Sequence, residues 1–199
     1  MDETHTLVCG PGGLTARWGL KPDIVSLGKS IAGGLPLGAY GMTDDVAAML
    51  EQIPGPQGRP ARTVATGGTL FGNALSLAAA RAALESVLTD AAYDRTAALG
   101  DRLADGMGRA VQNAGLPWAI HRLMCRSGYT FAPRLPRDAV EARRTEDEAL
   151  VRSLRIWLAN REVWEAIPGA GPTVAVPADA SHVDRYVAAF AEWVTEIVK

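Results

Sequence analysis

A short apolar segment that ends in a glycine and a lysine constrains this chain more than any other feature of its sequence. Residues 24–27 read Ile-Val-Ser-Leu, and Gly28, Lys29 and a glycine-rich run over residues 30–41 follow directly. Strand-favouring or small residues bounded in this way predict a short strand of a parallel sheet, buried on both faces. Glycines after the strand allow other groups to approach closely. The segment therefore predicts a buried strand that delivers one amine into a glycine-built pocket.

The same residues allow two other interpretations of Lys29. Most lysines keep their charge in water, so a lysine at the end of a strand can also be an ordinary surface residue. Residues 28–30 match the end of the phosphate-binding loop of nucleotide hydrolases, but that motif requires a glycine where Asp23 stands. The loop also opens into a long helix, whereas the glycines and proline of residues 33–36 break a helix within two turns. The sequence therefore disfavours a nucleotide-binding loop.

Three motifs in one order resemble the class III aminotransferases, which use pyridoxal 5'-phosphate. The motifs are Asp2-Glu3-Thr4-His5-Thr6, the run from Leu27 to Gly41 that contains Lys29, and Gly67-Gly68-Thr69-Leu70-Phe71-Gly72-Asn73. Within that family the chain is most similar to the glutamate-1-semialdehyde aminomutase branch. The resemblance covers essentially the whole chain, with specific motifs confined to residues 2–73. It implies an α/β chain of fold-type I, in which part of a large domain with a mostly parallel sheet precedes a small α+β domain.

The resemblance assigns roles to four residues. Lys29 corresponds to the lysine that forms a Schiff base with the cofactor aldehyde, and Asp2 to the carboxylate that faces the pyridine nitrogen. Gly68 and Thr69 correspond to a Gly-Thr step that contacts the cofactor phosphate, often across a dimer interface. The chemistry needs these residue types, because a lysine amine is both nucleophile and proton carrier. A carboxylate keeps the ring nitrogen protonated, so that the ring can accept electrons.

Glu3 and His5 flank these positions. The resemblance suggests that the Glu3 carboxylate orients its neighbours. His5 has two open interpretations, since it either lines the pocket or is simply hydrogen-bonded near the end of a strand. In the family the Asp-Glu pair ends a buried apolar strand, but only Met1 precedes Asp2 here. We therefore expect Asp2 to lack the strand that would hold it.

The function implied by the resemblance is pyridoxal-phosphate-dependent amino-group transfer, by a transaminase or an aminomutase. The substrates would be a small-molecule amino donor and an oxo acceptor. Family members are much longer, and the portion that they add precedes Asp2. We therefore expect the chain to be incomplete by itself and to act as a homodimer or with a complementing N-terminal half. The alternative is a truncated fragment without catalytic activity.

Composition and charge narrow the classes of function that this chain can have. The 20 basic and 22 acidic residues give a net charge of −2, which argues against a nucleic-acid partner. Cys9 and Cys125 lie far apart, which indicates a reducing compartment and argues against a zinc site, and we expect no bound metal. Arg81, Glu85 or glycines interrupt the longest apolar stretches, so neither a signal peptide nor a membrane span is expected. We expect a cytoplasmic protein.

The pattern of apolar residues predicts a boundary near residue 88. Residues 1–88 would be the C-terminal part of the cofactor-binding domain, with Asn73 as the N-cap of a helix over residues 74–88. The Pro- and Gly-rich residues 53–60 predict either an exposed surface loop or a mobile flap over the active site.

Residues 89–199 predict the small α+β domain. Helices are expected after Asp90, after a capping box formed by Thr145 and Glu148, and after Ser181. Each carries an apolar stripe along one face, which in the first helix consists of Leu99, Leu103, Met107, Val111 and Ala114. Between them lie three short segments that favour strands, at residues 118–122, 128–131 and 173–176.

Overall fold

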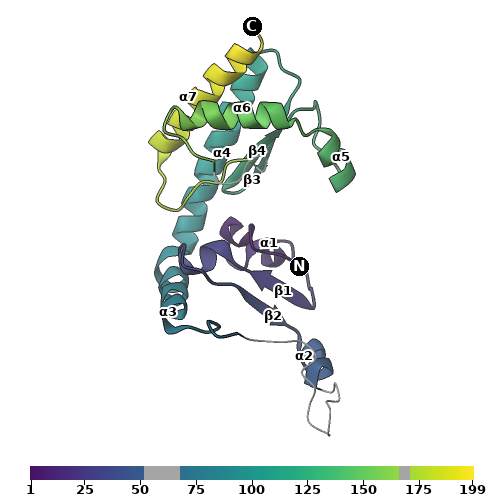
Figure 1. Ribbon diagram of the computed structural model, residues 1–199, viewed down its shortest axis with the longest axis vertical. Coiled ribbons are helices and arrows are strands. Elements are labelled where there is room, and N and C mark those ends of the chain that lie inside the picture. Colours follow the sequence, from purple (N-terminus) through teal and green to yellow (C-terminus); the bar gives the residue numbers. More distant parts are fainter. Residues whose placement is uncertain (52–67, 166–170) are drawn as a thin grey trace. The chain divides into compact units, whose positions relative to one another are not determined.

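The computed structural model describes residues 1–51, 68–165 and 171–199 (Figure 1). The chain forms two compact units, Met1–Asp90 and Ala91–Lys199. The expected loop or flap over residues 53–60 lies outside the described residues, as does Gly67 of the third motif. Throughout the three described ranges, every helix is too short or too polar to cross a bilayer.

Unit 1 consists of short elements around one strand pair. In order they are η1 (Leu7–Cys9), α1 (Gly13–Arg17), β1 (Ile24–Leu27), η2 (Lys29–Ala32), β2 (Ala39–Met42), α2 (Asp44–Glu51), α3 (Ala74–Ala82) and the π-helical segment η4 (Ala83–Val87). The η1 and η2 segments are 3₁₀ helices. Their brevity follows from the many glycines of this region, which favour turns over long helices.

The predicted strand over residues 24–27 is present as β1, but its surroundings differ from the prediction. β1 pairs antiparallel with β2, with Ile24 opposite Met42 and Leu27 opposite Ala39. A parallel bridge joins Asp2 to Ser26. β1 is partly buried at most, so the prediction of burial on both faces is wrong for the described residues. The glycine-rich run turns the chain back and places β2 antiparallel to β1, so the two strands form a two-stranded sheet.

A small apolar core holds α3 against η2. It consists of Leu7, Ile31, Ala32 and Ala80, with Leu27, Leu37 and Ala79 at its edge. Asn73 is the N-cap of α3, as predicted, since its Oδ1 accepts a hydrogen bond from the Ser76 amide at 2.9 Å. The Ser76 hydroxyl donates to the Pro36 carbonyl at 2.9 Å. These bonds fix the start of α3 on the loop between η2 and β2, and Figure 1 shows α3 beside the strand pair.

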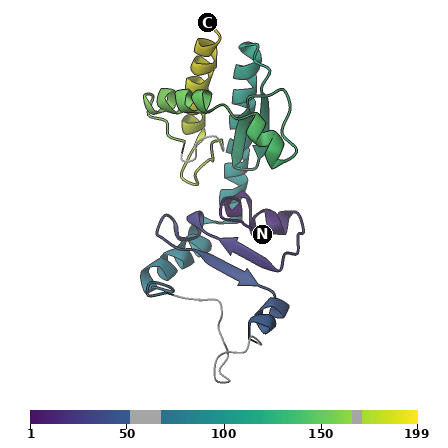
Figure 2. The same ribbon diagram turned by 45° about the vertical axis from the view of Figure 1, so that its right-hand side comes forward.

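Unit 2 is built from long helices and a β-hairpin. Its elements are α4 (Asp90–Asn113), which starts at the last residue of unit 1, β3 (Ala119–Leu123), β4 (Arg126–Thr130), α5 (Ala139–Arg144), α6 (Glu148–Ala159) and α7 (Ala180–Ile197). The hairpin lies beside α4 in both Figure 1 and Figure 2. The Ser127 hydroxyl donates to the Gly100 carbonyl at 2.7 Å, which ties β4 to α4. Of the three predicted strands, two form the antiparallel hairpin and the third is reduced to a bridge between Arg126 and Thr173.

An aromatic cluster fills the core of unit 2. Neighbouring rings have centroids 4.8–6.2 Å apart, and the members are Trp118, Tyr129, Phe131, Tyr186, Phe190 and Trp193. Leu103, Met107 and Val111 of α4 are buried, as the apolar stripe predicted. Such rings contribute both a large apolar area and favourable mutual orientation. The helical stripes found in the sequence therefore form this core.

Two predicted helix caps are wrong. The N-cap of α6 is Asp147, whose carboxylate accepts from the Leu150 amide at 3.0 Å, while Thr145 is the C-cap of α5. The N-cap of α7 is Asp179, which lies two residues before the predicted cap, Ser181. His182 completes a capping box with Asp179. In both cases a nearby aspartate supplies the cap, because its carboxylate accepts amide hydrogen bonds at least as well as a hydroxyl does.

Candidate active site

The N-terminal segment is anchored to β1 by backbone hydrogen bonds. The Met1 amine donates to the Ile24 carbonyl at 2.7 Å, and the Ser26 amide donates to the Met1 carbonyl at 3.0 Å. The Glu3 amide donates to the Ser26 carbonyl at 2.9 Å. These bonds form the parallel bridge that places Asp2 beside Ser26. Asp2 ends no strand of its own, as expected, but β1 supports it instead, which the sequence did not predict.

The Asp2 carboxylate is exposed and hydrogen-bonded on one oxygen. Its Oδ1 accepts from the Thr4 amide at 2.8 Å and from the Ser26 hydroxyl at 3.4 Å. The pKa of Asp2 lies below its usual value, chiefly because the Thr4 hydroxyl and amide stabilise the anion. Ser26 and the positive charge of Lys29 act in the same direction, and desolvation opposes them. Asp2 is therefore an anion at neutral pH.

Lys29 follows β1 after Gly28 and is the first residue of η2. Its φ of 51° is left-handed, a conformation that costs a residue with a side chain on the order of 1–3 kcal/mol and is concentrated at functional sites. The side chain is exposed, and within the described residues it forms neither a hydrogen bond nor an ion pair. Its charge nevertheless acts on Asp2. The structure thus brings Asp2 and Lys29, two of the predicted site residues, to the same strand.

Gly28 allows Thr4, the residue that donates to Asp2, to pack closely against the end of β1. A Cβ atom at this position would lie 3.2 Å from Cγ2 of Thr4, which is tighter than an ordinary contact. A side chain would push away the residue that donates to Asp2. The glycine before the lysine therefore serves the packing of the segment that carries Asp2.

Glu3 is buried on the opposite side of its segment, with 2% of its surface exposed. Both carboxylate oxygens are occupied. Oε1 accepts from the Thr15 amide and, at 2.5 Å, from the Thr15 hydroxyl. Oε2 accepts from the Leu14 amide at 3.2 Å and from the Thr6 hydroxyl. The carboxylate thus joins the N-terminal segment to the first residues of α1, an arrangement that the sequence suggested only as an orienting role.

Gly68 and Thr69 occupy an exposed turn that leads into α3. The Phe71 amide donates to the Gly68 carbonyl at 3.0 Å, and the Asn73 side chain donates to the Leu70 carbonyl at 3.1 Å. Among the described residues, no hydrogen bond or ion pair links this turn to Asp2 or Lys29. The structure therefore does not join the predicted phosphate-binding step to the other two site residues within one chain.

Sequence reasoning missed the partners of the Asp2 carboxylate. Thr4 and Ser26 hold it, yet Ser26 belongs to a strand that begins far along the chain. The only available signal was the polar residue inside an otherwise apolar strand. The left-handed backbone of Lys29 had no sequence signal at all.

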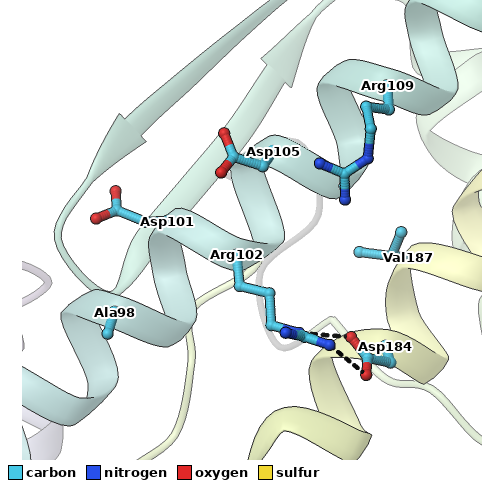
Figure 3. A pocket seen from close by; sticks show the side chains of 8 residues that line it. Ala98, Asp101, Arg102, Asp105, Arg109, Asp184 and Val187 are labelled. Atoms are coloured by element: carbon cyan, nitrogen blue, oxygen red, sulfur yellow. Dashed lines mark hydrogen bonds and ion pairs between the residues drawn. The ribbon is translucent and has the colours of Figure 1, made fainter.

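A cavity of about 520 Å³ between α4 and α7 of unit 2 contains none of the predicted site residues. Figure 3 shows Arg102 directed at Asp184, with Nε 2.7 Å from Oδ1 and an amino nitrogen 2.8 Å from Oδ2. Arg122 is shared by Asp101 and Asp105. These side chains are exposed and neutralise one another, so the cavity is a salt-bridged surface groove. The described ranges also contain no group of three His, Cys, Asp or Glu side chains placed to hold a metal ion.

Comparison with known sequences extends the match beyond the motifs. The family profile "Aminotransferase class-III" matches residues 1–122. A glutamate-1-semialdehyde 2,1-aminomutase from Desulfosudis oleivorans is 36% identical over 135 residues, which are 68% of this chain and 30% of the relative. A protein of the same name from Anaeromyxobacter dehalogenans is 37% identical over 132 residues, 66% of this chain and 29% of the relative. The matched part of the chain therefore spans less than a third of the length of these relatives.

Solved structures share the fold over almost the whole chain. The glutamate-1-semialdehyde aminomutase of Pseudomonas aeruginosa PAO1, solved in complex with PMP, superposes with a TM-score of 0.87 at 32% identity, covering 96% of this chain and 43% of that one. An omega-transaminase from Sphaerobacter thermophilus gives a TM-score of 0.79 at 27% identity, covering 99% of this chain and 43% of that one. These similarities confirm the predicted fold class, fold-type I. With more than half of its length matched by the family profile, the chain belongs to the class III aminotransferases.

Proposed function

We propose that this chain takes part in pyridoxal-phosphate-dependent amino-group transfer, as part of a transaminase or an aminomutase, with Lys29 as the Schiff-base lysine. One observation carries the proposal. The Asp2 carboxylate lies beside Ser26 of β1, and Lys29, which has no hydrogen bond or ion pair among the described residues, follows the end of the same strand after Gly28. Pyridoxal-phosphate enzymes use a lysine amine for the Schiff base and a side-chain partner for the protonated ring nitrogen, and Lys29 and Asp2 match these two groups.

The residues present fit pyridoxal 5'-phosphate. Two structural neighbours are described with PMP or PLP bound, and the chain belongs to the same family. When bound, the cofactor supplies an electron-accepting ring conjugated to its aldehyde carbon. Asp2 would accept a hydrogen bond from the protonated ring nitrogen. Lys29 would bond through Nζ to the aldehyde carbon with loss of water and, once released as the free amine, carry a proton to or from the substrate carbon.

Gly68 and Thr69 are proposed to hold the cofactor phosphate of a second copy of the chain. Two observations support this role in a partner subunit. The turn is exposed and makes no polar contact with Asp2 or Lys29 in the described part of its own chain. Large apolar side chains of the same turn and of α3 and η4 are exposed as well, namely Leu70, Phe71, Leu75, Leu77, Leu84 and Val87. Exposed apolar side chains grouped in this way are typical of subunit interfaces, so we propose a homodimer.

The substrates of the proposed reaction are a small-molecule amino donor and an oxo acceptor. The omega-transaminase among the similar proteins fits a separate donor and acceptor, whereas in an aminomutase one molecule supplies both groups. The proposed compartment is the cytoplasm, because neither of the two buried cysteines forms a disulfide.

Absorption spectroscopy of the complete protein tests the proposal. The purified protein is mixed with pyridoxal phosphate, and the near-visible band of the bound cofactor is compared between the wild type, Lys29→Ala and Lys21→Ala. Lys21 is a matched control, because it is an exposed lysine of the same unit. We expect the band in the wild type and in Lys21→Ala and its loss in Lys29→Ala. An unchanged band in Lys29→Ala would exclude Lys29 as the bonding residue.

A further inference from the structure

The environment of Glu3 points to a role beyond stability. Its buried carboxylate receives four hydrogen bonds, two on each oxygen, from the hydroxyl of Thr6, the amide of Leu14 and the amide and hydroxyl of Thr15. Gly13 is required for this approach, since a Cβ atom there would lie 2.5 Å from Oε2 of Glu3. The carboxylate is therefore enclosed by donors that come from two separate segments of unit 1.

The backbone of Glu3 is fixed as firmly as its side chain. Its amide donates to the Ser26 carbonyl at 2.9 Å, and its carbonyl accepts from the amides of Thr6 and Leu7 at 3.1 and 3.0 Å. Glu3 is thus tied to β1 through its amide and to α1 through its carboxylate. Residue 3 cannot rotate without breaking bonds on both sides.

Asp2 and Thr4 are the two neighbours of this fixed residue. The Thr4 amide donates to the Asp2 carboxylate at 2.8 Å, so both partners of that hydrogen bond are attached to Glu3 through one peptide each. In an extended segment, successive side chains point to opposite sides. This alternation agrees with the burial, since Asp2 is exposed while Glu3 is buried. Any displacement of the Glu3 backbone therefore moves the Asp2 carboxylate.

We propose that Glu3 is a positioning residue, which holds the Asp2 carboxylate in the orientation needed to keep the cofactor ring nitrogen protonated. This inference rests on the proposed function of Asp2 and Lys29. Glu3 itself touches neither substrate nor cofactor. It acts by locking the segment that carries Asp2 onto α1 and β1.

The ionisation of Glu3 agrees with this arrangement. Burial acts to raise the pKa of its carboxyl, but the hydrogen bonds from Thr15, Thr6 and Leu14 together outweigh burial and hold the pKa below its usual value. Glu3 is therefore an anion in the folded protein, stabilised by these donors. A neutral amide of the same shape would present two N–H groups to donors, and such a mismatch leaves buried polar groups unpaired.

Nuclear magnetic resonance of the ring nitrogen tests the proposal directly. The complete protein is loaded with pyridoxal phosphate labelled with ¹⁵N in the ring, and the ¹⁵N chemical shift is followed across the neutral pH range. In the wild type we expect the shift of a protonated ring nitrogen throughout. In Glu3→Gln we expect a shift toward the unprotonated value as the pH rises, and a loss of cofactor affinity on the order of tenfold. Asp2→Asn should show the same change more strongly.

Thr15 provides a second pair of variants in case Glu3→Gln folds poorly. Thr15→Val removes the hydroxyl that donates to Glu3 at 2.5 Å, whereas Thr15→Ser keeps it. We expect Thr15→Val to alter the ring-nitrogen shift in the same direction as Glu3→Gln and Thr15→Ser to restore the wild-type behaviour. Ser76→Ala is the matched control for stability, because it also removes a buried side-chain hydrogen bond in unit 1 but lies outside the Glu3 network.

The outcomes separate this inference from the proposed function. If the ring nitrogen stays protonated in Glu3→Gln and Thr15→Val, and only the thermal unfolding midpoint falls as it does in Ser76→Ala, Glu3 is merely structural and the inference is overturned. If the wild type binds no cofactor at Lys29, the proposed function fails and the inference fails with it.

Discussion

Asp2 lies directly beside Ser26 in a parallel bridge, and the Ser26 hydroxyl donates to the Asp2 carboxylate at 3.4 Å. Ser26 belongs to the strand that ends two residues before Lys29. This single strand therefore holds the carboxylate at one position and presents the amine from its end.

Complementation between two inactive variants tests the proposed role of Thr69 in a partner subunit. We expect both Lys29→Ala and Thr69→Ala to have strongly reduced amino-group transfer activity. Mixing them under conditions that allow subunit exchange should restore part of the activity, because one site of each mixed dimer then has both residues intact. Activity that stays at the level of the separate variants would place Thr69 in the same chain as its Lys29.

Replacing Gly100 or Gly108 of α4 with alanine should change the free energy of unfolding in opposite directions. A Cβ atom at Gly100 would lie 1.9 Å from the Met124 carbonyl oxygen, so Gly100→Ala should lower the free energy of unfolding by about 1–3 kcal/mol or prevent folding of unit 2. A Cβ atom at Gly108 would meet nothing within 4 Å, so Gly108→Ala should raise the free energy of unfolding by about 0.5–1 kcal/mol. Urea denaturation measures both. Equal effects would show that β3 and β4 do not pack on α4 as described.

Substitution of the N-cap tests where α7 starts. Asp179 accepts from the amides of Ser181 and His182, so Asp179→Ala should cost about 1 kcal/mol of unfolding free energy. Ser181→Ala should cost less, because the Ser181 hydroxyl only donates to the same carboxylate. Thermal unfolding of both variants compares the effects. A larger loss in Ser181→Ala would restore Ser181 as the cap that the sequence predicted.

The ionisation of Glu141 should make the free energy of unfolding depend on pH in the acidic range. Hydrogen bonds from the Arg137 side chain and amide, and from Arg134, lower the pKa of Glu141 from 4.5 to about 2. Because the pKa is lower in the folded state, the unfolded state binds more protons between these values. The stabilisation is therefore complete above pH 4.5 and is lost as the pH falls toward 2.

Thermal unfolding as a function of pH checks this prediction. In Glu141→Gln, the unfolding midpoint should fall less steeply in the acidic range than in the wild type. Glu146→Gln is a control, because Glu146 is exposed and forms no ion pair among the described residues. The same pH profile in the wild type and in Glu141→Gln would argue against the ion pairs with Arg134 and Arg137.

Local signals predicted much of the secondary structure. The strand over residues 24–27, the cap at Asn73 and the apolar stripe of α4 each depend on residues close together in sequence, and all three are present. The fold class followed from the resemblance and is confirmed by the structural comparisons. The strand predicted over residues 173–176 forms only a bridge, because strand propensity does not provide a hydrogen-bonding partner.

The geometry of the site depended on contacts between distant residues. The sequence named Asp2 and Lys29, but it did not predict that β1 supports Asp2, since this requires pairing between the N-terminus and residues 24–26. Nor did it predict the left-handed backbone of Lys29, which only the surrounding structure can impose. The four donors around Glu3 are likewise a product of folding, because Leu14 and Thr15 are brought to it by the turn before α1.

Covalent trapping of the cofactor tests the central claim most directly. The complete protein is incubated with pyridoxal phosphate, reduced with borohydride, digested and analysed by peptide mass spectrometry. The account predicts one stable adduct, on the peptide that contains Lys29, and no adduct on that peptide in Lys29→Ala. An adduct on another lysine of the wild type, or no adduct at all, would contradict it.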